Sequence, residues 1–317
     1  MYSNILIIGA SGQIGSELCQ RLRAEKDEGE VVASDIREAS DEVMQSGPFE
    51  ILDATNPDQL EEVVYHYGID EIYLMAAMLS GTAETFPMKA WDLNMKTLFN
   101  VLNLAKEMKI NKVFWPSSVA VFGSNTPKDN TPQHTITDPS SVYGISKLTG
   151  ERWCEYYHNR YNVDVRSIRY PGLISYATPP GGGTTDFSIE LYEYATKKKP
   201  YTCFIDKNTF LPMMYINDAI EATIQIMRAD AENLSIRSSY NLGGISLSPE
   251  MIVDSIQKHY PITVDYKPDF RQKIADSWPS KIDDSVAQKD WNWKHQYQLD
   301  DITQAMLKGF QEKVKAD

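Results

Sequence analysis

The first 170 residues alternate short apolar runs with longer amphipathic stretches. The apolar runs are almost continuous, which is typical of strands buried on both faces of a parallel sheet. The predicted strands are residues 4–9, 30–35, 49–53, 71–77, 112–117 and 165–170, and the predicted helices are residues 16–25, 58–67, 86–108 and 142–161. This alternation predicts an α/β chain with a doubly wound parallel sheet.

The pattern beyond Pro171 is less regular. The run Thr178–Asp186 reads TPPGGGTTD, and its glycine and proline content excludes a regular element there. We predict a strand leading into a helix at 214–228, a helix at 249–259 and irregular chain at 265–284. Residues 1–170, joined by 211–240, are therefore expected to form one domain, and 171–317 to form mostly a smaller α/β lobe.

Composition and charge narrow the classes of function. Hydrophobic residues make up 42% of the chain and charged residues 24%, which is ordinary for a globular protein. The 44 acidic residues outnumber the 31 basic ones, and the net charge of −13 disfavours partners such as nucleic acid or an anionic membrane. No apolar run approaches the roughly 20 residues that span a bilayer, and no basic segment precedes the first apolar run, so we expect no signal peptide.

The cysteines also bear on location. Cys19, Cys154 and Cys203 are odd in number and widely spaced, which favours free thiols in a reducing compartment and hence a cytoplasmic location. They form no metal-binding pattern, so we expect no catalytic metal.

A glycine-rich segment follows the first predicted strand and opens the first helix. Residues 9–15 read GASGQIG. Glycines at this spacing allow a tight turn, a close approach of the backbone to a pyrophosphate and close packing of helix on strand. The N–H groups and dipole of the helix then favour the anion. The segment predicts a dinucleotide site that includes Gly9, Gly12, Gln13, Ile14 and Gly15.

Two carboxylates end the next two predicted strands. Asp35 lies twenty residues after Gly15 and can accept hydrogen bonds from both hydroxyls of the adenosine ribose. Because it would repel a 2′-phosphate, NAD is favoured over NADP as the cofactor. Arg37 offers a cation for that phosphate, or else flanks the adenine or lies in solvent. Asp53 either meets the adenine amino group or caps the loop at Thr55.

A tyrosine and a lysine provide candidate chemistry. Tyr143 and Lys147 are four residues apart, on one face of a predicted helix. A nearby ammonium and a nicotinamide cation both favour the phenolate, so we expect a lowered pKa for Tyr143 and a base for a substrate hydroxyl. Ser118, at the end of a predicted strand, is placed to orient that hydroxyl, or else is simply a turn residue.

These segments together resemble the extended short-chain dehydrogenase/reductase family over essentially the whole chain. The resemblance rests on GASGQIG, Asp35, LMAA at 74–77, Asn94, SSVAVFG at 117–123 and the pair Tyr143 and Lys147. Phe122 departs from the family's usual tyrosine, and we expect little effect. The family implies a seven-stranded Rossmann sheet with a small C-terminal substrate lobe. It also implies that the helices of Asn94 and Tyr143 pair across a homodimer as a four-helix bundle.

The family also implies an NAD site. Its residues would be Gly9, Gly12, Gln13, Ile14, Gly15, Asp35, Ile36, Arg37, Asp53, Ala54, Leu74, Ala76, Ala77, Asn94, Tyr143, Lys147 and Pro171.

Four further stretches are similar to the short-chain branch of the L-threonine 3-dehydrogenases. They are LSGTAE at 79–84, RYPGLI at 169–174 with PGGGTTD at 180–186, LPMMY at 211–215, and DSWP at 276–279 with the residues up to Trp293. The resemblance implies NAD-dependent oxidation of the β-hydroxyl of L-threonine to 2-amino-3-oxobutanoate, in threonine catabolism. Catalysis would fall to Tyr143, Lys147 and Ser118, with hydride passing to nicotinamide C4. The residues around the substrate would be Ser80, Ser118, Tyr143, Gly183, Thr184, Thr185 and Trp278.

Recognition of the substrate's charged ends is predicted only in part. The glycine-rich loop with Thr184 and Thr185 is expected to offer backbone N–H groups and hydroxyls to the carboxylate. For the substrate ammonium, Ser80 and Thr82 are only candidates. Trp278 is a pocket wall or, in the commoner use of tryptophan, part of the lobe core.

Two other functions remain open at this point. A nucleotide-sugar epimerase or reductase on the same scaffold would need a basic clamp for the diphosphate, and Arg271 is the obvious basic residue for it. A dehydratase would need an acid pair where Val119-Ala120 stand. A non-catalytic nucleotide-sensing protein is disfavoured, because such proteins can lose the tyrosine or the lysine that this chain keeps.

Overall fold

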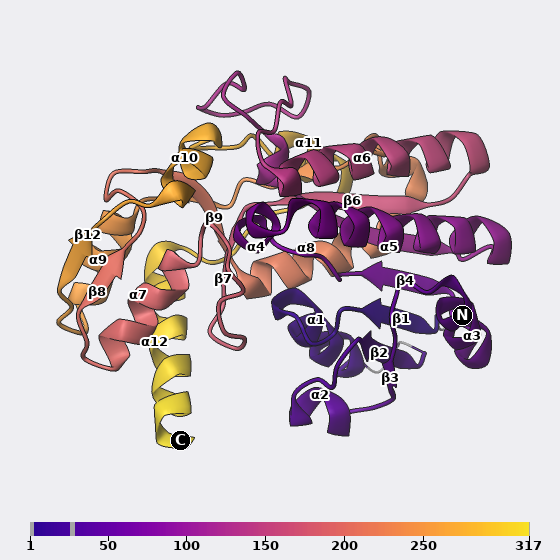
Figure 1. The fold of residues 1–317 in the computed structure, drawn as a ribbon, viewed down its shortest axis with the longest axis horizontal. Helices are drawn as coiled ribbons and strands as arrows, with labels where there is room; N and C mark the ends of the chain where they lie inside the picture. The colour runs from indigo at the N-terminus through magenta and orange to yellow at the C-terminus, as the bar shows by residue number, and fades with distance from the viewer. Residues whose placement is uncertain (1–2, 26–28, 317) are drawn as a thin grey trace.

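A seven-stranded parallel sheet forms the larger of two parts, which Figure 1 shows beside a smaller lobe. The computed structural model describes residues 3–25 and 29–316. The strand order is β10-β6-β5-β4-β1-β2-β3. The strands are β1 (Ile5–Ile8), β2 (Val31–Asp35), β3 (Phe49–Ile51), β4 (Glu71–Leu74), β5 (Lys112–Ser118), β6 (Val165–Tyr170) and β10 (Tyr240–Asn241). The doubly wound α/β fold is thus confirmed, and its crevice lies where the order reverses between β1 and β4.

Helices cover both faces of this sheet because its strands are apolar on both sides. In β1, Ile5 and Ile7 pack into one core, and Leu6 and Ile8 pack into the other. The first core is closed by α1 (Gln13–Arg23) and α8 (Ile216–Arg228), and the second by α3 (Pro57–Tyr67), α5 (Pro87–Met108) and α6 (Val142–Tyr161). Because the strands are parallel, their carboxyl ends and the loops that follow them lie at one edge of the sheet, the edge that faces the lobe.

The lobe is built from two small sheets and several helices. A three-stranded sheet has the order β11-β9-β7, and a two-stranded parallel sheet pairs β12 with β8. Its elements are β7 (Gly172–Ile174), α7 (Phe187–Thr196), β8 (Tyr201–Cys203), β9 (Leu211–Tyr215), β11 (Ile245–Leu247), α9 (Pro249–Gln257), β12 (Val264–Tyr266), α10 (Phe270–Ser277) and α12 (Leu299–Ala316). The shorter elements elsewhere are α2 (Asp41–Gln45), α4 (Ser80–Thr85), η1 (Val119–Val121), η2 (Ala231–Asn233) and α11 (Ser285–Trp291).

The prediction of irregular chain at 265–284 is wrong for much of its length. That range contains the end of β12 and the whole of α10. The Asp269 side chain caps α10 by accepting a hydrogen bond from the Arg271 backbone N–H at 2.8 Å. Gln272, inside α10, accepts a hydrogen bond from the Asp206 backbone N–H at 2.7 Å. Contacts of this kind, between residues far apart in the sequence, help to stabilise the helix. The hydrophobic periodicity of the sequence does not predict them.

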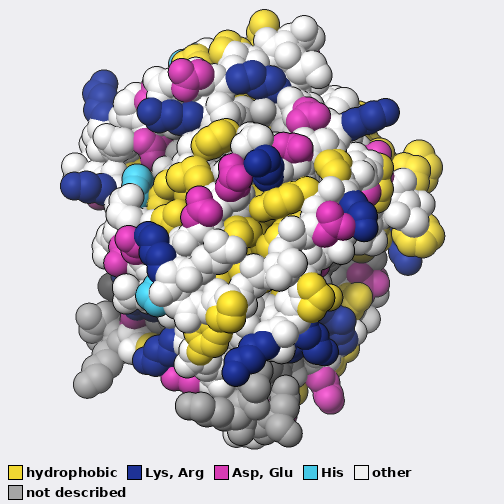
Figure 2. Space-filling model, turned by 90° about the vertical axis from the view of Figure 1, so that its left-hand side faces the viewer, with side chains coloured by type: hydrophobic (Ala, Val, Ile, Leu, Met, Phe, Trp, Pro, Cys, Tyr) yellow, Lys and Arg dark blue, Asp and Glu magenta, His cyan; other side chains and the backbone are white. Residues whose placement is uncertain are grey.

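The outer surface of the lobe mixes residue types. Figure 2 shows hydrophobic side chains there, interspersed with lysine, arginine and acidic side chains. The exposed apolar residues of the lobe include Tyr194, Phe210, Met251 and Phe270. In the part of the chain that is described, no helix combines the length and the apolar character needed to cross a membrane.

Candidate active site

A cavity of about 140 Å³ lies where the large sheet meets the lobe. Its lining comes from the segments after β1, β4, β5 and β6, from the start of α6, and from the loop before α7. Among its lining residues are Gln13, Ile14, Met75, Ala77, Ser80, Ser118, Tyr143, Lys147, Pro171, Gly183, Thr184, Thr185, Asp186 and Trp278. A wider surface hollow of about 830 Å³, between Lys198 and Thr263, contains no predicted site residue.

Tyr143 stands in the first turn of α6, and its hydroxyl is hydrogen bonded to the Ser118 side chain. The helix begins there because the Ser141 hydroxyl caps it, accepting from the Gly144 N–H at 3.1 Å. Burial raises the pKa of Tyr143 to about 12, and the hydrogen bond from Ser118 lowers it only in part. Without cofactor, desolvation of the phenolate thus outweighs the local donors, and the lowering expected beside a nicotinamide cation stays a prediction.

Lys147 lies one turn further along α6 and is buried. Its ammonium donates to the Pro116 carbonyl at 2.6 Å and lies 4.6 Å from the centre of the Trp115 ring. Its distance from the centre of the Tyr143 ring is 5.5 Å. Burial lowers the pKa of Lys147 to about 7. Burial thus disfavours the charged form of Lys147 and weakens the stabilisation that its ammonium gives to a Tyr143 phenolate.

A buried ion pair lies next to Lys147 and joins α6 to β6. Glu151, one turn after Lys147, pairs with Arg169 on β6 at 2.7 Å. The Glu151 carboxylate also accepts from the Ser117 hydroxyl at 2.6 Å, and Arg169 donates to the Asn241 side chain at 3.0 Å. Both charges are buried, so each depends on the other and on these hydrogen bonds. The network fixes the position of α6 against the strand that carries Ser118.

The glycine-rich segment has the geometry of an anion cradle. Gly9 has a φ of 94°, and a Cβ there would lie 2.6 Å from the Ala76 backbone nitrogen. A Cβ on Gly15 would lie 2.2 Å from the Gly9 carbonyl oxygen. At the start of α1, the N–H groups of Gln13 and Ile14 donate to no residue that the structure describes. These free donors at a helix N-terminus fit the pyrophosphate of a dinucleotide.

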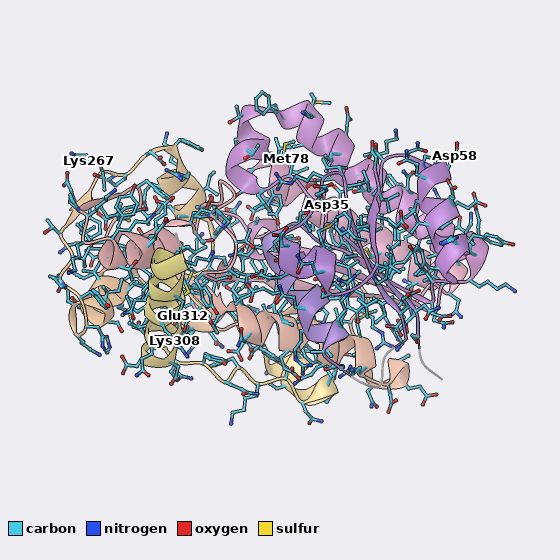
Figure 3. All side chains as sticks on the ribbon, turned by 90° about the horizontal axis from the view of Figure 1, so that it is seen from below. Asp35, Asp58, Met78, Lys267, Lys308 and Glu312 are labelled. Carbon is cyan, nitrogen blue, oxygen red and sulfur yellow. The ribbon has the colours of Figure 1, made fainter. Side chains whose placement is uncertain are left out.

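Asp35 ends β2 beside this cradle. Its carboxylate accepts from the Ser11 N–H at 3.0 Å, which joins the glycine-rich turn to the end of β2. Ile36 and Arg37 follow and are exposed. Figure 3 shows Asp35 and Met78 on the side of the sheet domain that faces the lobe, which carries Lys267 and Lys308. Asp35 is thus placed at the crevice, as a group that binds the adenosine ribose must be.

The remaining predicted cofactor residues lie along the same edge. Asp53 accepts from both the backbone N–H and the hydroxyl of Thr55, at 2.9 and 2.7 Å. Both hydrogen bonds end on the same carboxylate oxygen, so Asp53 caps the loop at Thr55 through one of its two oxygens. Ala54 is buried, and its carbonyl accepts from Asn100 at 2.9 Å. Asn94 is hydrogen bonded to the backbone of Met78. Leu74 ends β4 and Ala76 follows it. Contact of these residues with a cofactor stays a prediction.

The predicted substrate residues line the cavity, but one expected role is corrected. The N–H groups of Gly182 and Gly183 donate to the Asp186 carboxylate, at 2.8 and 2.7 Å. They are therefore not available to a substrate carboxylate. The Thr184 hydroxyl shares a hydrogen bond with Ser80 at 3.3 Å. The backbone N–H groups of Thr184 and Thr185, by contrast, donate to no described residue.

Asp186 is a site residue that the sequence interpretation missed. It lines the cavity and is buried, and burial raises the pKa of its carboxyl group. One of its oxygens holds the two glycine N–H groups, which leaves the other for a cationic ligand. The only signal in the sequence was an acidic residue at the end of the TTD motif.

Arg271 does not line the cavity. Its guanidinium pairs with Asp269 at 2.7 Å and packs over the Phe204 ring. The clamp that a nucleotide-sugar enzyme would need is therefore engaged elsewhere. Within residues 3–25 and 29–316, no three His, Cys, Asp or Glu side chains gather as metal ligands would.

Comparison with known proteins identifies the family. The sequence model of the NAD dependent epimerase/dehydratase family matches residues 5–243. The chain belongs to that family. An uncharacterized epimerase/dehydratase of Staphylococcus haemolyticus is 47% identical over 98% of this chain and 98% of its own.

Two solved structures have names that are more specific than the family's. The holo form of a GalE-like L-threonine dehydrogenase from Cupriavidus necator is 49% identical, with a TM-score of 0.93 over 96% of this chain and 99% of that one. A monomeric L-threonine 3-dehydrogenase from a metagenome is 40% identical, with a TM-score of 0.94 over 98% and 99%. These likenesses within the epimerase/dehydratase family agree with the branch to which the sequence motifs are similar.

Proposed function

We propose that this enzyme is an NAD-dependent L-threonine 3-dehydrogenase, which oxidises the β-hydroxyl of L-threonine to 2-amino-3-oxobutanoate. One observation carries the proposal: Tyr143, Ser118 and the Asp186 carboxyl group, which accepts the two glycine N–H groups through only one of its oxygens, line the same small cavity. A volume of about 140 Å³ suits a small zwitterion, whereas sites for drug-sized ligands measure roughly 300–1,000 Å³. A nucleotide sugar would need more room and a basic clamp.

The residues of the chain have separate roles in this reaction. Tyr143 removes the hydroxyl proton, Ser118 orients that hydroxyl, and Lys147 supplies positive charge beside the tyrosine. The Asp186 carboxylate receives the substrate ammonium, and the N–H groups of Thr184 and Thr185 receive its carboxylate. Trp278 closes the pocket from the lobe. NAD bound beside Tyr143 and Lys147 would supply the acceptor for the hydride of the β-carbon.

The predicted cofactor residues form a continuous path to this pocket. Gln13 and Ile14 would hold the pyrophosphate, and Asp35 would hold the adenosine ribose. We assign the other predicted residues, from Asp53 to Pro171, to the two ends of the same cofactor. On this proposal residues 1–170 make the NAD domain. Of the predicted stretch 211–240, α8 packs on the large sheet and Tyr240 begins β10, which pairs with β6, whereas β9 belongs to the lobe. Residues 171–317 make mostly the substrate lobe.

Activity is expected to rise with pH. The reactive form of Tyr143 is deprotonated, and burial raises its pKa to about 12, so the protonated form predominates at neutral pH. Raising the pH from about 7 to about 9 should increase kcat/KM for L-threonine, by at most about tenfold per unit. Initial rates of NADH formation measure this. A flat or falling profile contradicts the role of Tyr143 as base.

The protonation of Lys147 does not lower the free energy of unfolding as the pH rises from about 7 to about 9. Burial lowers the pKa of Lys147 to about 7 from an ordinary 10.5, so between these values the unfolded chain binds more protons than the folded one. The contribution of Lys147 to stability therefore increases as the pH rises through that interval. Melting temperatures recorded in each buffer are the control that separates loss of rate from loss of fold.

A homodimer through α5 and α6 is the assembly we propose. These neighbouring helices carry four exposed apolar side chains, Met88, Ile145, Trp153 and Tyr156. Exposed apolar patches are typical of protein–protein interfaces. We expect sedimentation at twice the chain mass of 36.0 kDa, and a shift to monomer for Trp153→Glu. An unchanged mass in that variant, or a monomeric wild type, contradicts this interface.

The cytoplasm is the location we propose. Cys19, Cys154 and Cys203 are all free and buried, as suits a reducing compartment. Fractionation of the source cells tests this location, and recovery from an extracytoplasmic fraction contradicts it.

A further inference from the structure

One lysine of the sheet domain reaches the lobe wall of the cavity. Lys128 lies in the segment between η1 and α6, residues 124–139, which Figure 1 shows above α6 and beside α10. Its ammonium donates to the carbonyl oxygens of Asp276 at 3.0 Å, Ser277 at 2.5 Å and Trp278 at 3.3 Å. The lysine therefore holds the end of α10 and the residue that follows it.

The chemistry of this contact suits a cation. The last carbonyls of a helix have no partner within the helix, and the negative end of the helix dipole lies there. A lysine ammonium carries three protons around one nitrogen, so it can donate to several converging carbonyls. Burial lowers the pKa of Lys128, and the carboxylates of Asp138 and Asp276 oppose that shift.

Further hydrogen bonds join the 124–139 segment to the residues that follow α10. The Lys128 carbonyl accepts from the backbone N–H and the hydroxyl of Ser280, at 2.9 and 3.0 Å. Thr131 donates to the Lys281 carbonyl at 3.0 Å, and a bridge joins Thr131 to Ile282. Residues 276–282 are thus tied to the sheet domain on both sides of Trp278.

Trp278 separates two spaces. It is only 7% exposed and lines the active-site cavity. It also lines an outer hollow of about 430 Å³, together with Lys128, Phe210 and Asp276. A displacement of Trp278 would therefore connect the substrate pocket with that outer hollow and enlarge the pocket.

We propose that Lys128 is a positioning residue that holds Trp278 in place and thereby limits the length of the β-hydroxy amino acid that the pocket accepts. This inference rests on the proposed function. The lysine does not touch the reacting atoms, and it acts through the wall that it fixes. The 124–139 segment is in this respect a specificity element of the sheet domain.

The test compares Lys128→Met with Lys273→Met. Lys273 is a matched control because it is exposed on α10 itself and its side chain donates to no described residue. In Lys128→Met we expect kcat/KM for L-threonine to fall roughly tenfold, mostly through KM, because small displacements of a positioning wall are costly. The KM for NAD should stay within about twofold, since Lys128 does not line the cavity and the variant leaves the glycine-rich turn unchanged. Selectivity for L-threonine over 2-amino-3-hydroxypentanoate should narrow, and Lys273→Met should match wild type.

A second measurement does not depend on activity. Hydrogen exchange of the amides in residues 276–282 should be faster in Lys128→Met than in wild type or Lys273→Met, with the amides of α1 unchanged. Unchanged selectivity together with unchanged exchange overturns the inference, as does an equal loss of NAD and threonine binding. A wild-type enzyme that is silent with L-threonine overturns the proposed function instead, while the exchange result still decides whether Lys128 holds the wall.

Discussion

Replacing Tyr143 with phenylalanine is expected to lower kcat for L-threonine oxidation by roughly 10²–10⁴-fold, the range that a positioned acid–base group contributes. The phenyl ring keeps the packing at the start of α6, while the hydroxyl that is bonded to Ser118 is lost. NAD binding should remain within about twofold of wild type, because the glycine-rich cradle is untouched. Initial rates of NADH formation measure kcat, and titration with NAD measures the affinity for the cofactor.

Tyr192→Phe is the matched control for this substitution. Tyr192 is fully buried whereas Tyr143 is partly buried, and the Tyr192 hydroxyl is likewise hydrogen bonded to one hydroxyl side chain, that of Thr303, at 3.0 Å inside the lobe. Its loss should cost about 1 kcal/mol of stability and leave kcat unchanged. If Tyr143→Phe retains wild-type turnover, or if both variants lose activity equally, the base is another group.

Replacing Asp35 with alanine is expected to raise the KM for NAD roughly 10²-fold and to relax discrimination against NADP. The carboxylate ends β2 beside the Ser11 N–H, where hydrogen bonds to two ribose hydroxyls are available to it. Each hydrogen bond to a charged group is worth about 1.5–3 kcal/mol, so the expected 10²-fold rise corresponds to the lower end of what the loss of two such bonds gives. Removing the negative charge also removes its repulsion of a 2′-phosphate.

Initial rates with each cofactor measure this change. Glu38→Ala is the control, since Glu38 is an exposed carboxylate three residues away. It should change neither KM nor the preference for NAD. A preference for NAD that survives in Asp35→Ala contradicts the assignment of the ribose site.

The sheet domain was predictable from the sequence because its signals are local. The run at 4–9 is apolar at successive positions, and both faces of β1 are in fact buried. Glycines at 9 and 15 stand where the backbone packs too closely for a side chain, and a Cβ on Gly12 would lie 3.3 Å from the Gly9 carbonyl oxygen. Helix α10 was missed because its support comes from Lys128 and Asp206, which are distant in the sequence.

The candidate site was predictable in its membership but not in its electrostatics. Tyr143, Ser118, Thr184 and Trp278 do line one cavity. The rise in the pKa of Tyr143 in the chain without cofactor was not predictable, since it depends on how far the fold buries the phenol. The use of the Gly182 and Gly183 N–H groups by Asp186 is likewise a matter of loop conformation, which residue types alone do not fix.

The central claim is the identity of the substrate, and the most direct test is NADH formation with L-threonine beside L-serine, D-threonine, L-allo-threonine and UDP-galactose. The account predicts rapid NADH formation with L-threonine, far above that with the other four, because the small cavity must match both charged ends and the β-hydroxyl. No NADH with L-threonine, from protein shown to bind NAD, would contradict it and would favour a nucleotide-sugar substrate.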